Sequence, residues 1–200
     1  MKRKFIILII LLSNFSSTTL FAQKWKIGAT LSPVLSKYIY AEHIIEQYPE
    51  LYSKYGLGIS AGINFYRLYG KNFMIKTGLL INNKNFRLNV FLSDNNYIET
   101  KRSMYFIAFP LAFQYNFKIK KQTFFLNSGF ELSFAFATID KTDKERFTNH
   151  YWNAAYEIYF GLGYQFKLDE KHTFYISPEY SPKIFDDDYS TFRLNLGLIF

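Results

Sequence analysis

Three histidines are the residues of this chain most suited to acid–base catalysis, and each lacks the neighbours that catalysis requires. A hydrolase needs a histidine beside a serine nucleophile and a carboxylate that orients the imidazole ring. His150 has no serine at a matching place along its expected strand, His43 has Glu42 and Glu46 nearby but only a loop to hold them, and His172 falls in a short turn. We therefore expect solvated or interfacial histidines and predict that the protein is not an enzyme.

The run Asp186, Asp187 and Asp188 is the stretch most suited to binding a cation, because calcium prefers oxygen ligands. Three consecutive carboxylates point in different directions, however, and the run lacks the glycine-punctuated spacing of a calcium loop. The chain also has no glycine-rich phosphate loop, no zinc-ligand spacing and no nucleotide fingerprint. We expect a solvated loop at this place, and we predict neither a metal nor a cofactor.

The formal net charge of +8 raises the question of an anionic partner. The cations are scattered along the chain and the N-terminus indicates export, so we expect no nucleic-acid partner. A charged loop from Asp140 to Asn149 and a second loop from Ser36 to Tyr55 carry cations suited to the phosphates of lipopolysaccharide. These are Lys37, Lys54, Lys141, Lys144 and Arg146.

The N-terminus has the pattern of a secretory signal peptide. Lys2, Arg3 and Lys4 precede the apolar run from Phe5 to Leu12, and cleavage is expected after Ala22. An uncleaved membrane anchor is the alternative, but the run is shorter than the roughly 20 apolar residues that a spanning helix needs. We predict a signal peptide at 1–22 and a single domain at 23–200.

The mature chain alternates apolar and polar residues with the period of two that is typical of β-strands. The clearest case is the last stretch, from Ser190 to Phe200, which ends on an aromatic residue of its apolar face and is expected to close a sheet on itself. Pro33 is expected to end the first strand or to mark an edge, and a short helix is expected within 41–46. We expect eight strands, near residues 25–32, 56–68, 73–82, 105–117, 124–136, 152–166, 174–180 and 190–200.

The polar face of these strands decides between a membrane barrel and a soluble one. On a soluble barrel the polar face meets water and is rich in charged residues, whereas here it carries mostly small residues. Small inward residues fit an eight-stranded barrel, because its interior is just wide enough for side chains to fill. We predict an all-β, eight-stranded antiparallel up-and-down transmembrane barrel, with a soluble barrel as the alternative. Its inward charges, expected to pair and to plug the lumen, are Lys26, Lys76, Glu131, Glu157, Lys167, Glu179 and Arg193.

Three features resemble the PorT-like, "porin family" outer-membrane β-barrel proteins. They are the signal ending Phe21-Ala22-Gln23, the strand Tyr105 to Phe117 with its central Pro-Leu and its Tyr-Asn-Phe end, and the terminal Phe200. The resemblance implies a Gram-negative outer membrane and insertion by the barrel-assembly machinery through the terminal aromatic strand, with Phe200 as the assembly signal. Members of that family differ in role, so it implies no functional residues.

The function expected from the sequence is that of a non-enzymatic integral outer-membrane protein with a side-chain-filled lumen, serving surface interaction or envelope structure. A small-solute porin and a PorT-like component of protein export are the alternatives, and a lipid-modifying outer-membrane enzyme is a third. The sequence names no surface or periplasmic protein partner.

Overall fold

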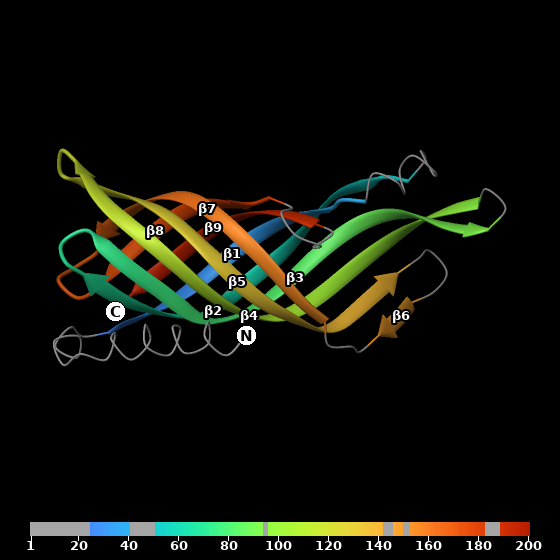
Figure 1. Ribbon diagram of the computed structural model, residues 1–200, viewed down its shortest axis with the longest axis horizontal. Coiled ribbons are helices and arrows are strands. Elements are labelled where there is room, and N and C mark those ends of the chain that lie inside the picture. Colours follow the sequence, from blue (N-terminus) through green and yellow to red (C-terminus); the bar gives the residue numbers. More distant parts are fainter. Residues whose placement is uncertain (1–24, 41–50, 94–95, 142–145, 150–152, 183–188) are drawn as a thin grey trace, which may run out of the picture.

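The computed structural model describes residues 25–40, 51–93, 96–141, 146–149, 153–182 and 189–200. The described chain folds into antiparallel strands joined by turns and loops (Figure 1). The strands are β1 (Lys26–Tyr38), β2 (Ser53–Tyr69), β3 (Phe73–Ser93), β4 (Asn96–Ile119), β5 (Gln122–Lys141), β6 (Arg146–Asn149), β7 (Asn153–Lys167), β8 (Thr173–Ser181) and β9 (Tyr189–Ile199). No helix within these ranges is long and apolar enough to cross a membrane.

The sheet closes into a barrel of eight strands. Neighbouring strands run in the order β4-β3-β2-β1-β9-β8-β7-β5, and pairing between β4 and β5 closes the circle, while the short β6 pairs only with the far end of β5. The last strand pairs with β8 on one side and with β1 on the other. Beyond β9, the backbone amide of Phe200 donates to the carbonyl oxygen of Ile27 at 2.8 Å. The eight-stranded barrel predicted from the sequence, closed by its last strand, is therefore confirmed.

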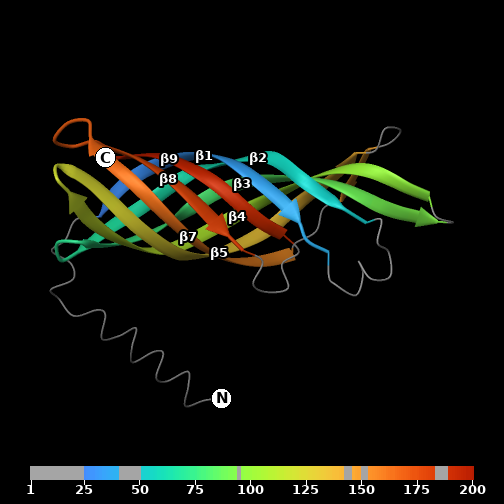
Figure 2. The ribbon, with the colours of Figure 1, turned by 90° about the horizontal axis from the view of Figure 1, so that it is seen from above.

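The two ends of the barrel differ. At one end, here called the turn end, β2–β3, β4–β5 and β7–β8 are joined by tight connections, and Gly70 and Lys120 take positive φ angles of 64° and 57°. At the other, here called the loop end, β3 and β4 continue well past the barrel wall and β6 adds to β5 (Figures 1 and 2). Short turns at one end and long extensions at the other are typical of outer-membrane barrels, in which the turns face the periplasm.

The strands are longer than the sequence predicted, above all toward the loop end. Pro33 does not end the first strand: it pairs with Ile59 of β2, and only the ladder with β9 is interrupted beside it, between Leu31 and Val34. Residues 83–93 and 96–104 extend the β3–β4 hairpin, and part of the loop expected at 140–149 is strand, as the ends of β5 and as β6. The helix expected within 41–46 lies outside the described residues.

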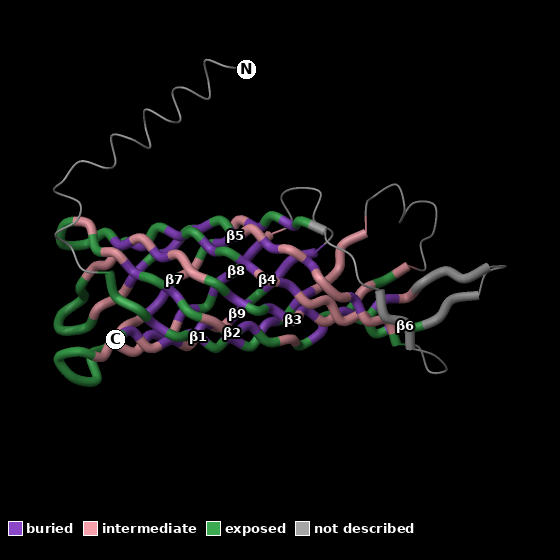
Figure 3. Tube along the Cα trace, turned by 90° about the horizontal axis from the view of Figure 1, so that it is seen from below, coloured by how far each residue is buried: buried purple, intermediate pink, exposed green. Residues whose placement is uncertain are grey.

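The burial pattern is the reverse of that in a soluble protein. Along most of the barrel wall, buried positions alternate with exposed or intermediate ones (Figure 3), and the exposed positions carry the large apolar side chains. On β3, for example, Phe73 is 59% exposed and Ile81 is 61% exposed, whereas Lys76, Asn82 and Lys84 are buried in the interior. An apolar outer band around a polar interior is stable where the outer band meets lipid instead of water.

Candidate functional site

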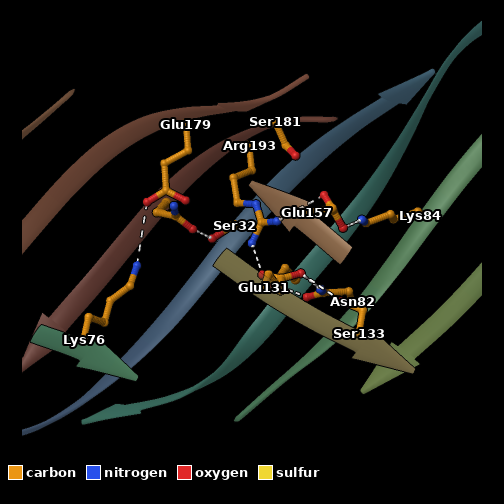
Figure 4. A network of polar contacts seen from close by, with 12 residues as sticks. Ser32, Lys76, Asn82, Lys84, Glu131, Ser133, Glu157, Glu179, Ser181 and Arg193 are labelled. Carbon is orange, nitrogen blue, oxygen red and sulfur yellow. Dashed lines mark hydrogen bonds and ion pairs between the residues drawn. The ribbon is translucent and has the colours of Figure 1, made fainter. Parts of the chain in front are cut away.

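The centre of the lumen holds an ion-pair network around Arg193 of β9 (Figure 4). Its Nη1 lies 2.7 Å from Oε2 of Glu131, and its Nη2 lies 3.8 Å from Oε2 of Glu157. Asn82 Nδ2 and Ser133 Oγ donate to the other oxygen of Glu131, at 2.8 and 3.2 Å. The carboxylate of Glu131 is thus surrounded by donors from three other positions, which is the condition for keeping a charge away from water.

Two lysines complete the network on either side of this centre. Lys84 pairs with Glu157, and Lys76 Nζ lies 3.7 Å from Oε1 of Glu179, which also accepts from Nδ2 of Asn127 at 2.5 Å. Among the described residues, the buried ionised side chains are three cations and three carboxylates, so the interior is electrically balanced. Such a balanced, hydrogen-bonded arrangement offsets part of the desolvation cost of six buried charges.

Two hydrophobic clusters lie on either side of the polar layer along the barrel axis. The loop-end cluster consists of Phe86, Leu88, Phe106, Ala135, Ala155 and Tyr189, and the turn-end cluster consists of Tyr66, Met74, Phe125, Tyr175 and Ile199. The ammonium group of Lys84 lies 4.3 Å from the ring centroid of Tyr189, so the network reaches the loop-end cluster directly. The polar layer is therefore covered by apolar side chains toward both mouths.

Inward glycines make room for the inward aromatic rings. Gly163 pairs with Phe125 and Gly197 pairs with Tyr175 across neighbouring strands. A Cβ atom at either glycine would come within about 2.0 to 2.2 Å of the facing ring. Each ring therefore occupies the space above a glycine, and these pairs fill the lumen at the turn end.

The seven charges predicted for the lumen fall into two groups. Lys76, Glu131, Glu157, Glu179 and Arg193 are buried and brought together, as described above. Lys26 and Lys167 are exposed and line the mouth at the turn end. Lys84 is buried in the network but was absent from the predicted set, because the third strand was expected to end at Asn82. Two more residues of strict alternation would have placed it inside.

The mouth at the turn end is a cavity of about 660 Å³. Its cationic lining residues are Lys26, Lys71, Lys118 and Lys167, and amides of Asn72, Asn116 and Gln165 lie among them. Tyr66, Met74 and Ile199 of the turn-end cluster also line the cavity, so this cluster separates it from the polar layer.

Of the residues considered for catalysis or metal binding, only His172 is described. Its Nδ1 lies 2.6 Å from Oδ2 of Asp169, whose other oxygen accepts from the backbone amides of Lys171 and His172. The hydrogen bond from His172 is the main cause that lowers the pKa of Asp169 to about 2. The pair therefore fixes the β7–β8 turn.

Within the described ranges no group of three or more His, Cys, Asp or Glu side chains is placed to hold a metal. His43, His150 and the run 186–188 lie outside those ranges.

Comparisons with known proteins agree with this architecture. No curated protein matches the sequence. Among solved structures, the outer membrane protein OprG from Pseudomonas aeruginosa is similar with a TM-score of 0.51 and 10% identity, over 88% of this chain and 93% of that one. Neisserial surface protein A (TM-score 0.49, 9% identity) and the attachment invasion locus protein Ail of Yersinia pestis (0.46, 11%) each align over 88% of this chain and 95% of theirs.

The family comparison covers most of the chain. Residues 21–186 match the model of the outer membrane protein beta-barrel domain. At these identities the structural likeness concerns the fold alone, and the match gives the broad family without the PorT-like subdivision that the sequence pattern resembles. The chain therefore belongs to the outer membrane protein beta-barrel domain family, and it is an integral outer-membrane β-barrel.

Proposed function

We propose that this protein is a non-enzymatic, non-conducting outer-membrane barrel that serves surface interaction or envelope structure. The observation that carries the proposal is the filling of the lumen. The balanced network around Arg193 lies between two hydrophobic clusters, so a hydrated ion crossing the barrel would have to displace both clusters and break the ion pairs. Breaking a buried ion pair costs about 3–5 kcal/mol.

The part of the barrel available to a partner is then the loop end. There β3 and β4 form a long hairpin that continues past the barrel wall, and β6 pairs with the far end of β5 (Figure 1). The backbone of this hairpin is already paired between β3 and β4, which lowers the entropy that the backbone loses on association. This supports a role in contact with molecules at the cell surface.

The test is single-channel conductance of the protein purified from outer membranes and inserted into planar bilayers. The wild type is compared with Glu131→Gln/Glu157→Gln, which removes two lumen acids, and with the matched control Glu99→Gln/Glu170→Gln, which removes two acids from exposed positions. We expect silence from the wild type and from the control. A stable, discrete wild-type conductance that the lumen variant alters would overturn the proposal in favour of a small-solute porin.

A role in protein export is the second candidate, and it is favoured by the resemblance of the strand Tyr105 to Phe117 to PorT-like proteins. A deletion strain that still exports its surface proteins would exclude this role. A lipid-modifying activity is tested in the same strain, because such an enzyme changes the mass of lipid A. Identical lipid A mass spectra from cells with and without the protein support the non-enzymatic role.

A further inference from the structure

Four strands at the loop end place basic residues directly opposite one another. Lys54 of β2 pairs with Arg87 of β3, Arg87 pairs with Lys101 of β4, and Lys101 pairs with Lys141 of β5. The register continues to Arg146 of β6. Neighbouring strands lie about 4.8 Å apart, so the four side chains from Lys54 to Lys141 form a row roughly 15 Å long. We call these four residues the cationic row.

The cationic row faces away from the lumen. Phe86 and Leu88, the neighbours of Arg87 in β3, are both buried in the interior, so Arg87 projects to the outside. All four side chains of the row are exposed, and within the described part of the chain none has an acidic partner within 4 Å. Lys54 lies over the ring of Tyr52, with its Nζ 5.1 Å from the centroid.

The height of the row is set by the apolar band below it. Tyr105 lies on the same face of β4, four residues closer to the turn end than Lys101, which is about 13 Å along the strand. At a strand tilt of about 40°, the row lies roughly 10 Å above this tyrosine. Tyrosines of outer-membrane barrels lie at the level of the headgroups, so the row lies at and just above that level.

A row of like charges in direct cross-strand pairs is unfavourable by itself. Glu99 lies two residues before Lys101, on the same face of β4, and is exposed. It balances at most one positive charge of the row. Asp140 is adjacent to Lys141 in sequence, but its carboxylate binds Arg102 at 2.8 Å. The arrangement is therefore suited to an external partner with several closely spaced negative charges.

We propose that the cationic row binds the phosphate groups of lipopolysaccharide in the outer leaflet. This assignment rests on the membrane position in the proposed function. Phosphates of that leaflet lie beside the barrel wall at the height of the row, whereas a soluble polyanion would have to reach past the surrounding lipid. The planar guanidinium of Arg87 offers two parallel donors to a phosphate, and the lysines on either side offer point charges.

The experiment measures binding of lipid A to the protein purified from outer membranes in a neutral detergent. The row variant Lys54→Gln/Arg87→Gln/Lys101→Gln/Lys141→Gln is compared with the control Lys71→Gln/Lys118→Gln/Lys121→Gln/Lys171→Gln, which removes four charges near the turn end. Heat-modifiable migration on gels shows that each variant is folded. The probes are lipid A with both phosphates and the same lipid A after removal of its phosphates.

We expect the row variant to bind phosphorylated lipid A at least about tenfold more weakly than the wild type, since one charge-assisted hydrogen bond accounts for about that factor. The control keeps wild-type affinity, and removing the phosphates weakens the wild type as much as removing the row does. Equal weakening of both variants, or no loss without phosphates, would overturn the proposal. Tighter binding of a heparin oligosaccharide than of lipid A, lost in the row variant, would assign the row to a sulfated polysaccharide instead.

The outcome is independent of the conductance test. The row lies outside the lumen, so the row variant is expected to keep the wild-type silence in planar bilayers. A conducting wild type would refute the filled lumen and leave the row intact. Unchanged lipid A binding in the row variant would refute the row and leave the filled lumen intact.

Discussion

Replacing Arg193 with methionine is the sharpest perturbation of the lumen. Arg193 and Glu131 are both nearly inaccessible, and their charged atoms lie 2.7 Å apart. The substitution keeps an unbranched side chain of similar length but leaves two buried carboxylates, those of Glu131 and Glu157, with Lys84 as the closest remaining cation. An uncompensated charge then remains in the interior.

The expected loss of stability depends on the hydrogen bonds that the carboxylate of Glu131 keeps. Removing one partner of a buried ion pair costs about 3–5 kcal/mol of the free energy of unfolding. Glu131 retains the donors Asn82 and Ser133, so we expect a loss near the lower limit, about 3 kcal/mol. The double variant Arg193→Met/Glu131→Gln removes the orphaned charge as well, and we expect it to recover about 2 kcal/mol of that loss.

The assay is urea unfolding of the protein in phosphatidylcholine vesicles, followed by tryptophan fluorescence and by migration on gels. Arg102→Met is the control, because Arg102 forms a two-pronged ion pair with Asp140 at 2.8 and 2.9 Å near the loop end, where the two side chains are 32% and 17% exposed. A partly exposed pair contributes about 1 kcal/mol or less. Equal losses in the two single variants, or no recovery in the double variant, would mean that water reaches the network and would refute the reasoning.

Three further predictions concern the lipid face, a turn and the chain end. Leu79→Arg places a charge in the middle of the exposed apolar face of β3. It is expected to lower the free energy of unfolding in urea by about 2–4 kcal/mol. A smaller loss than that of Thr77→Arg, which lies nearer the turn end, would contradict lipid contact at Leu79. The hydrogen bond from His172 lowers the pKa of Asp169 from 3.8 to about 2, so its contribution to the turn is complete above pH 3.8 and is lost as the pH falls through about 2. The amide signal of His172 in NMR should change with pH as Asp169 becomes protonated. A midpoint of this change above pH 3.8, or the same pH dependence in Asp169→Asn, would contradict the prediction. Deleting Phe200 is expected to abolish the heat-modifiable form in outer membranes, and normal assembly of the shortened chain would exclude it as the assembly signal.

The sequence predicted the barrel because the two faces of each strand in a membrane barrel meet two different media. From Phe130 to Phe134 the outward side chains meet lipid and the inward Glu131 and Ser133 meet a polar lumen, so apolar and polar residues alternate clearly. Beyond Asn83 the alternation continues but its sense is reversed, because the apolar Phe86 and Leu88 point inward and the polar Arg87 points outward, so these residues do not continue the apolar outer face of the strand. The extensions of β3, β4 and β5 and the short β6 were therefore missed.

The sequence predicted which residues face the lumen, but not the height of each one along the barrel axis. Alternation assigns Lys26, Glu131 and Arg193 equally to the inward face, but it does not tell which lie at mid-height and which at a mouth. That depends on the register between strands, which is set by pairings such as Glu131 with Glu157 and Glu179 with Arg193. The cationic row depends on register in the same way, since its members are separated by 14 to 40 residues in sequence and meet only through four-strand pairing.

The measurement that tests the filled lumen most directly is the reactivity of a single cysteine placed at Ser133. The chain has no cysteine of its own, and Ser133 is fully buried within the network. A charged, membrane-impermeant methanethiosulfonate reagent is added to each side of vesicles that contain Ser133→Cys, with Gln165→Cys at the turn-end mouth as the positive control. The filled lumen predicts that Gln165→Cys reacts from the turn side and that Ser133→Cys reacts from neither side. Rapid reaction of Ser133→Cys would show an open aqueous path and contradict the proposed function.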